Sequence, residues 1–141
     1  MNEIYKLSIQ DVINKIQNRE INVIELIENH IETAKNNIVS NAFITNTFDI
    51  ARKKAIISDT RYKQKNNRKL EGIPISIKDL FCTENIKTTC GSRMLQDFIP
   101  SYNATVVTKI INAGAIIFGK TNMDEFGMGS SNTTSLSLIH I

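Results

Sequence analysis

The spacing of hydrophobic residues in the first half of the chain predicts three helices and one short strand. The apolar positions of the first helix are Ile9, Val12, Ile13 and Ile16. These positions recur at helical steps, and Ser8 stands before them as a candidate N-cap. A second helix is expected from about Val23 to Lys35 and a third from Thr47 to about Tyr62, with a strand candidate at Ala42 to Thr45 between them.

The second half of the chain predicts two strands and one helix. Residues 73–78 alternate between apolar and polar, which predicts a strand whose three isoleucines share one face. Residues 105–113 form an amphipathic pattern that Gly114 terminates, and residues 115–118 are a continuous apolar strand of the parallel kind. A helix, a glycine and an apolar strand in succession are typical of α/β folds.

Lys78 ends the alternating strand, where open α/β sheets bind their ligands. The pattern alone leaves Lys78 as either a solvated strand end or a catalytic amine. A free lysine amine has a pKa of about 10.4 and is protonated at neutral pH, whereas burial without a counter-carboxylate can turn a lysine into a general base. Strand alternation directs Asp79 away from Lys78, and we expect Asp79 to cap a following turn.

Composition indicates one globular domain of ordinary size. The chain has 141 residues, of which 41% are hydrophobic and 22% charged, and its net charge of +3 is too weak to indicate nucleic-acid binding. It has no apolar run long enough for a membrane span and no signal-peptide pattern at its start. Cys82 and Cys90 are expected to be reduced thiols, His30 a packed helix residue, and no metal site is predicted.

The segment from Arg61 to Lys69 is polar and basic. It is either a solvated loop or a patch that contacts RNA. It has no aromatic or glycine interleaving and no helical stripe, which favours the solvated loop.

Residues 114–121 match the phosphate-loop pattern G-x-x-x-x-G-K-[ST]. That motif requires a strand before its first glycine, a loop through its middle and a helix that opens at the lysine. Here a predicted helix precedes Gly114 and the middle residues predict a strand, so the match is interpreted as chance. We expect Lys120 to pair with a carboxylate at the strand end instead.

Two stretches resemble the amidase signature family. They are Gly72-Ile73-Pro74-Ile75-Ser76-Ile77-Lys78-Asp79 and Gly119-Lys120-Thr121-Asn122-Met123-Asp124-Glu125-Phe126-Gly127-Met128-Gly129-Ser130-Ser131-Asn132. Within the family, the chain is most similar to the branch that provides tRNA-dependent amidotransferases with their amidase component. The features of this branch are Asp124, the following residues 128–131, and residues 86–92 with 102–107 after them.

The resemblance implies a fold and a site. The fold would be the N-terminal part of an α/β/α sandwich, a mixed sheet flanked by helices, with residues 1–135 as part of a single amidase domain. Lys78 would be the base of a Ser–cis-Ser–Lys triad. A substrate-binding loop would be formed by Gly127, Met128, Gly129, Ser130 and Ser131. Its two glycines would allow close approach to a ligand, and its amides or hydroxyls would hold substrate or oxyanion.

The same resemblance implies a function for the parent protein. It would hydrolyse glutamine and supply ammonia for the conversion of Glu-tRNA(Gln), or Asp-tRNA(Asn), to the amide. The B and C subunits of the amidotransferase would complete a heterotrimer, and the partner would bind the charged tRNA and use ATP and Mg²⁺. The chain itself would hold no cofactor and contact no membrane. The cytoplasm, or an organelle of bacterial descent, would be its location.

The family's glycine- and serine-rich signature, with both catalytic serines, is expected after Ser135 and does not occur in this sequence. We therefore expect the chain to be truncated and inactive. Residues 136–141 read Leu-Ser-Leu-Ile-His-Ile. A widely used transposase sequencing adapter encodes this sequence in one reading frame, so these residues are interpreted as a non-native tail. The strand that ends at Gly119 would then lack its sequence-distant partners, and the chain would be poorly soluble.

Two other functions stay open. A free-standing amidase for small amides would use the same chemistry, without a partner protein. A nucleotide-binding module built on residues 114–121 is the alternative from another class.

Overall fold

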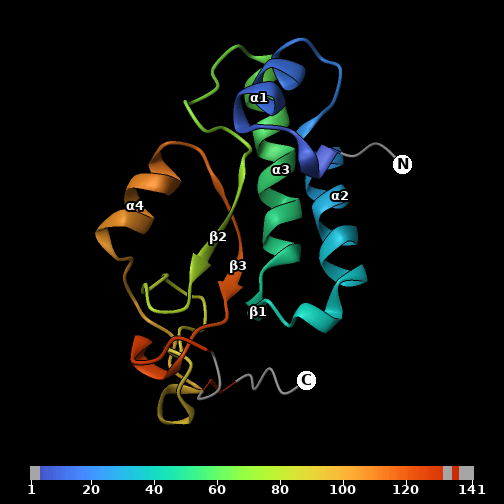
Figure 1. Cartoon of the computed structure of the whole chain (residues 1–141). Coiled ribbons are helices and arrows are strands. Elements are labelled where there is room, and N and C mark those ends of the chain that lie inside the picture. Colours follow the sequence, from blue (N-terminus) through green and yellow to red (C-terminus); the bar gives the residue numbers. More distant parts are fainter. Residues whose placement is uncertain (1–3, 132–134, 137–141) are drawn as a thin grey trace.

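The computed structural model describes residues 4–131, 135 and 136, and shows helices packed on both sides of a small sheet (Figure 1). The regular elements are the α-helices α1 (Ile9–Gln17), α2 (Val23–Asn36), α3 (Phe48–Lys63) and α4 (Thr105–Asn112), and the strands β1 (Phe43–Asn46), β2 (Pro74–Lys78) and β3 (Ile116–Thr121). Short 3-10 helices lie at Ile4–Lys6, Ile38–Ser40, Arg93–Leu95 and Glu125–Gly127. Each helix and strand expected from the sequence is present, with ends displaced by a few residues.

The caps predicted for α1 and α4 are present. Ser8 Oγ caps α1 by accepting a hydrogen bond from the backbone N–H of Asp11 at 3.2 Å. The start of α2 is capped twice. Asn22 accepts a hydrogen bond from within the helix, and the carboxylate of Asp59 on α3 accepts one from Val23 N at 2.7 Å. Gly114 follows the end of α4 with φ of 101°, a left-handed conformation that favours glycine.

The sheet is mixed, and β3 is its central strand. The order is β1-β3-β2, with β1 antiparallel and β2 parallel to β3. The expectation that the strand ending at Gly119 would lack partners is therefore wrong, because β1 and β2 flank it. Pro74 has no N–H for a ladder hydrogen bond, and it lies in β2, which is an edge strand in the described part of the chain.

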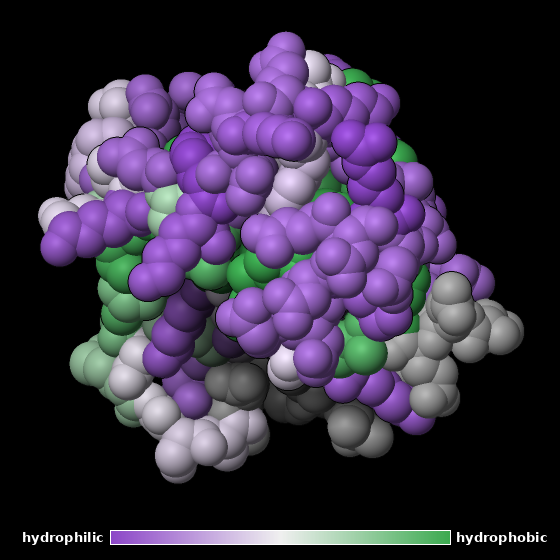
Figure 2. Space-filling view, turned by 90° about the horizontal axis from the view of Figure 1, so that it is seen from above, coloured by the Kyte–Doolittle hydropathy of each residue, from purple (hydrophilic) through white to green (hydrophobic). Residues whose placement is uncertain are grey.

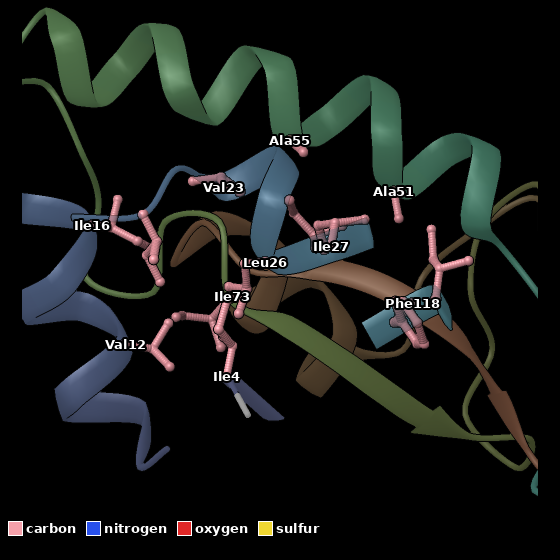
Figure 3. Packing of buried hydrophobic residues seen from close by; sticks show 13 residues of the cluster. Ile4, Val12, Ile16, Val23, Leu26, Ile27, Ala51, Ala55, Ile73 and Phe118 are labelled. Atoms are coloured by element: carbon pink, nitrogen blue, oxygen red, sulfur yellow. The ribbon is translucent and has the colours of Figure 1, made fainter. Parts of the chain in front are cut away.

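The two faces of β3 contribute to two hydrophobic clusters. Ile116 and Phe118 join the larger cluster, formed with α1, α2 and α3 (Figure 3). Ile117 points to the other face and packs with Val107 of α4 and Ile77 of β2. The expectation that the three isoleucines of residues 73–78 share one face is wrong for Ile73. It precedes β2, outside the alternation of the strand, and packs in the larger cluster.

The basic segment at residues 61–69 lies at the end of α3. Lys63, Lys65 and Lys69 are exposed, as the solvated-loop interpretation predicts. Arg68 instead contacts the fully buried carboxylate of Glu71, with Nε 2.6 Å from Oε2. Hydrophilic side chains cover most of this end of the molecule (Figure 2).

Leu136 is the only residue of the predicted tail, 136–141, that the structure describes. Leu136 donates a backbone hydrogen bond to Gly91 O at 2.6 Å, and Ser135 before it is buried. Residues 137–141 lie outside the described residues.

Candidate active site

Lys78 lies at the carboxyl end of β2, as predicted. It is level with Thr121 at the end of β3, and its carbonyl accepts a hydrogen bond from Phe81 N at 3.0 Å, which turns the chain away from the sheet. The side chain of Lys78 is exposed. A lysine that acts as a general base requires burial, and in this chain the described residues do not bury Lys78.

Asp79 lies on the opposite face and is fully buried. The prediction that it points away from Lys78 is confirmed. Its carboxylate Oδ2 accepts hydrogen bonds from Thr89 N at 2.8 Å and from Thr89 Oγ1 at 2.5 Å. We expected Asp79 to cap the turn directly after β2. Instead, it binds a segment ten residues further along the chain. The reason is that the chain returns to the sheet end at Thr89, an approach that local sequence does not encode.

Lys120 forms an ion pair with Asp79, which confirms the prediction that Lys120 pairs with a carboxylate at the strand end. Both side chains are fully buried, and Lys120 Nζ lies 3.2 Å from Asp79 Oδ1, an ion pair without hydrogen-bond geometry. Nζ donates hydrogen bonds to Thr88 Oγ1 at 2.7 Å and to Phe81 O at 3.0 Å. Burial lowers the pKa of Lys120, and the nearby carboxylate of Asp79 opposes that shift.

The phosphate-loop interpretation of residues 114–121 is excluded by this geometry. Ile116–Thr121 is the central strand, so the middle of the pattern is extended backbone rather than a loop around phosphate. Lys120 is enclosed rather than directed at a ligand.

The predicted substrate loop follows β3 and lies at the same end of the sheet as Lys78 (Figure 1). Its five residues, Gly127 to Ser131, are exposed. Gly127 has φ of 71°, and a Cβ on Gly129 would lie 2.6 Å from the Asp124 carboxylate, so both positions favour glycine. The loop is thus built for close packing on its own base, with its outer side open.

A turn at residues 88–92, whose role the sequence did not reveal, connects the two predicted parts of the site. Cys90 N donates to Asp79 O at 3.1 Å, and Cys90 O accepts from Phe126 N at 2.8 Å. Ser92 Oγ donates to Glu125 at 2.6 Å. Gly91 has φ of 67°, and a Cβ there would lie 2.7 Å from Met123 O. The run Thr88–Thr89–Cys90–Gly91–Ser92 was the available signal, since small and hydroxyl side chains suit such a turn.

His30 has a structural role, and the two cysteines form no disulfide. His30 Nδ1 lies 2.9 Å from Leu26 O, and its ring packs edge-on against Phe118, as a packed helix residue should. Cys82 and Cys90 are free thiols, and burial raises the pKa of Cys90. Among the described residues, no group of His, Cys, Asp or Glu could hold a metal ion, and no helix is long and apolar enough to cross a membrane.

Comparison with known proteins identifies the family. Residues 23–139 match the Amidase family. The chain is 46% identical over 135 residues to the A subunit of glutamyl-tRNA(Gln) amidotransferase from Rickettsia bellii, covering 96% of this chain and 27% of that protein. The protein of the same name from Wolbachia pipientis is 47% identical over 137 residues, again with 96% of this chain covered, and 28% of that protein.

Solved structures agree with the sequence match. A native peptide amidase from Stenotrophomonas maltophilia superimposes with a TM-score of 0.80 at 26% identity, over 88% of this chain and 26% of that one. A bacterial aryl acylamidase of the amidase signature enzymes gives 0.79 at 25% identity, over 85% and 26%. The chain spans about a quarter of the length of these relatives, and it belongs to the amidase signature family.

Proposed function

We propose that the chain is part of the glutamine-hydrolysing subunit of a tRNA-dependent amidotransferase. The whole protein would release ammonia from glutamine for the conversion of Glu-tRNA(Gln), or Asp-tRNA(Asn), to the amide. The observation that carries the proposal is the placement of Lys78 and the Gly127–Ser131 loop at one sheet end, in a chain 46% identical to a protein named as that component.

In this proposal Lys78 is the general base and the loop holds substrate. An exposed amine is a poor base, so the protein beyond these residues must bury Lys78 in the active enzyme. The serine nucleophile and the cis-serine that relays its proton are expected there as well. The 141 residues alone are expected to be inactive.

The B and C subunits complete the proposed complex. The partner that binds tRNA would use ATP and Mg²⁺ to activate the acyl group, and the present chain would hold no cofactor. Its location would be the cytoplasm or an organelle of bacterial descent.

The test is glutamine hydrolysis by the whole protein with its partners. Lys78→Ala is expected to lower kcat by at least about a hundredfold, because general acid–base catalysis contributes about 10²–10⁴-fold. Lys109→Ala, which removes an exposed lysine of α4, is the matched control and should leave kcat unchanged. Full activity of the Lys78→Ala variant would overturn the proposal.

A second candidate is a free-standing amidase. The similarity in fold to a peptide amidase and an aryl acylamidase favours it. Hydrolysis of small amides at full rate without any partner protein, and no response of glutaminase activity to the B and C subunits, would select this alternative.

A further inference from the structure

The buried pair Asp79–Lys120 lies where three segments meet. Asp79 follows the last residue of β2, Lys120 belongs to β3, and both contact the turn at residues 88–92. Neither side chain is exposed. Two charges removed from water are costly unless they are paired and hydrogen-bonded, so this arrangement tolerates little displacement of either strand end.

The pair also connects the two parts of the candidate site. Lys120 Nζ donates a hydrogen bond at 3.0 Å to the carbonyl oxygen of Phe81, which lies three residues after Lys78. The Asp79 carboxylate accepts hydrogen bonds from Thr89. The backbone carbonyl of the next residue, Cys90, accepts a hydrogen bond from Phe126 N, at the base of the Gly127–Ser131 loop. A shift of the pair would therefore move the exit of β2 and the Gly127–Ser131 loop relative to each other.

The pair has an electrostatic consequence for Lys78. Asp79 is the residue next to Lys78, and a carboxylate near an amine favours the protonated amine. Here the negative charge of Asp79 faces away from Lys78 and is neutralised by Lys120. Cys82 and Cys90 are the other titratable groups that act on Lys120, and Glu125 on the facing loop accepts a hydrogen bond from Ser92.

We propose that Asp79 and Lys120 are positioning residues of the amidase site, which fix Lys78 relative to the substrate loop and keep the charge of Asp79 from acting on Lys78. The inference rests on the proposed function, because it assigns Lys78 the role of base. Neither residue touches the substrate.

The experiment compares Lys120→Met, Asp79→Asn and the double variant in the whole amidotransferase, with Lys109→Met as the matched control. Each single variant is expected to lower kcat for glutamine about tenfold or more, because misplaced catalytic groups lose rate steeply. Lys120→Met leaves the buried carboxylate of Asp79 unneutralised, so the acid limb of the pH profile should move to higher pH. Asp79→Asn should not move it upward, and the double variant, with both charges removed, should return the limb to the wild-type position.

A purely structural role would lower the amount of folded enzyme without moving the pH profile. Single variants whose folded enzyme keeps the wild-type kcat and pH profile would overturn the inference. If these single variants keep the wild-type kcat and pH profile while Lys78→Ala is inactive, only the inference is overturned and the proposed function stands. If Lys78→Ala stays active, the proposed function fails instead.

Thr88→Val is a milder variant for the case in which the charge variants do not fold. It removes the hydrogen bond from Lys120 but keeps both charges. It is expected to lower kcat about threefold or more, because Lys120 loses one of its contacts and the site groups that the pair positions shift, without moving the pH profile. Thr108→Val, at an exposed position of α4, is its control. Wild-type kcat in Thr88→Val, together with charge variants that do not fold, would overturn the inference.

Discussion

Two fully buried carboxylates flank β2, and they are held in different ways. Glu71 precedes the strand and pairs with Arg68, a residue three positions away in the same loop. Asp79 follows the strand and pairs with Lys120 on the neighbouring strand. The side chain of Arg68 is 38% exposed, whereas that of Lys120 is 0% exposed.

The difference shows what each pair can do. Glu71 also accepts a hydrogen bond from Ser58 of α3 at 2.6 Å, and Tyr62 donates to its carbonyl, so its pair fastens α3 to the loop before β2. It lies at the end of the sheet away from Lys78. The Asp79 pair fastens the end where Lys78 and the Gly127–Ser131 loop lie. One carboxylate thus secures the fold, and the other secures the candidate site as well.

The largest effect on stability is expected from Asp79→Asn, which leaves Lys120 buried without a counter-charge. The free energy of unfolding should fall by about 3–5 kcal/mol, as it does when one partner of a buried ion pair is removed. Urea denaturation of the whole protein measures it. A loss below about 1 kcal/mol would mean that Lys120 reaches water or sheds its proton easily, and the contrast with Glu71 would disappear.

Glu71→Gln should have a smaller effect, because Arg68 can still be hydrated. A loss of about 1–3 kcal/mol is expected at neutral pH, the range for a buried group that loses its hydrogen-bonding partner. Burial alone would raise the pKa of Glu71, but the hydrogen bonds from Arg68 and Ser58 outweigh it and hold the pKa below the ordinary value of 4.5.

The pH dependence of this variant follows from that shift. A carboxyl whose pKa is lower in the folded state stabilises the protein above its unfolded pKa, and this contribution is lost as pH falls through the folded pKa. The stability difference between wild type and Glu71→Gln should therefore be full at neutral pH and shrink below about pH 4. Urea denaturation at neutral pH and below about pH 4 measures this difference. The same stability difference at both would contradict a lowered pKa of Glu71.

Arg52→Ala should have the smallest effect and provides the exposed reference for both buried pairs. Arg52 lies 2.6 Å from Glu28 and 3.0 Å from Asp49, and all three side chains are at least a third exposed. The expected loss is small, well below that of Glu71→Gln, because water screens such pairs. Added salt should reduce it further, and a loss as large as that of Glu71→Gln would show that exposure does not separate these pairs.

Periodicity in the sequence was sufficient to predict the helices and strands. The apolar stripe of α2 and the continuous run in β3 each bury the residues that the pattern marked, such as Ile27, Ile31 and Ile116. The motif around Lys78 placed that lysine at the correct end of the correct strand. Alternation also indicated that Asp79 points away from Lys78, because it is a local property of an extended chain. The expectation that Lys120 pairs with a carboxylate came instead from rejecting the phosphate-loop match.

Contacts between distant segments were not predicted. Nothing local identifies Asp79 as the partner of Lys120, or Thr89 as the residue that Asp79 holds. The solvated-loop interpretation of residues 61–69 did not anticipate that Arg68 is drawn to a buried Glu71. The central position of β3 was also missed, because strand order depends on which edges meet and not on the pattern within any strand.

The sequence by itself determined which segments are helix or strand, that Gly114 ends a helix, and that the chain resembles the amidase signature family, because backbone preference and side-chain alternation act over a few residues. Only the tertiary structure decided the strand order, the pairing of Asp79 with Lys120, and the position of the turn at residues 88–92 between Lys78 and the Gly127–Ser131 loop. Those features arise where segments far apart in the chain must satisfy each other's buried charges and backbone groups, and such requirements exist only once the segments have met.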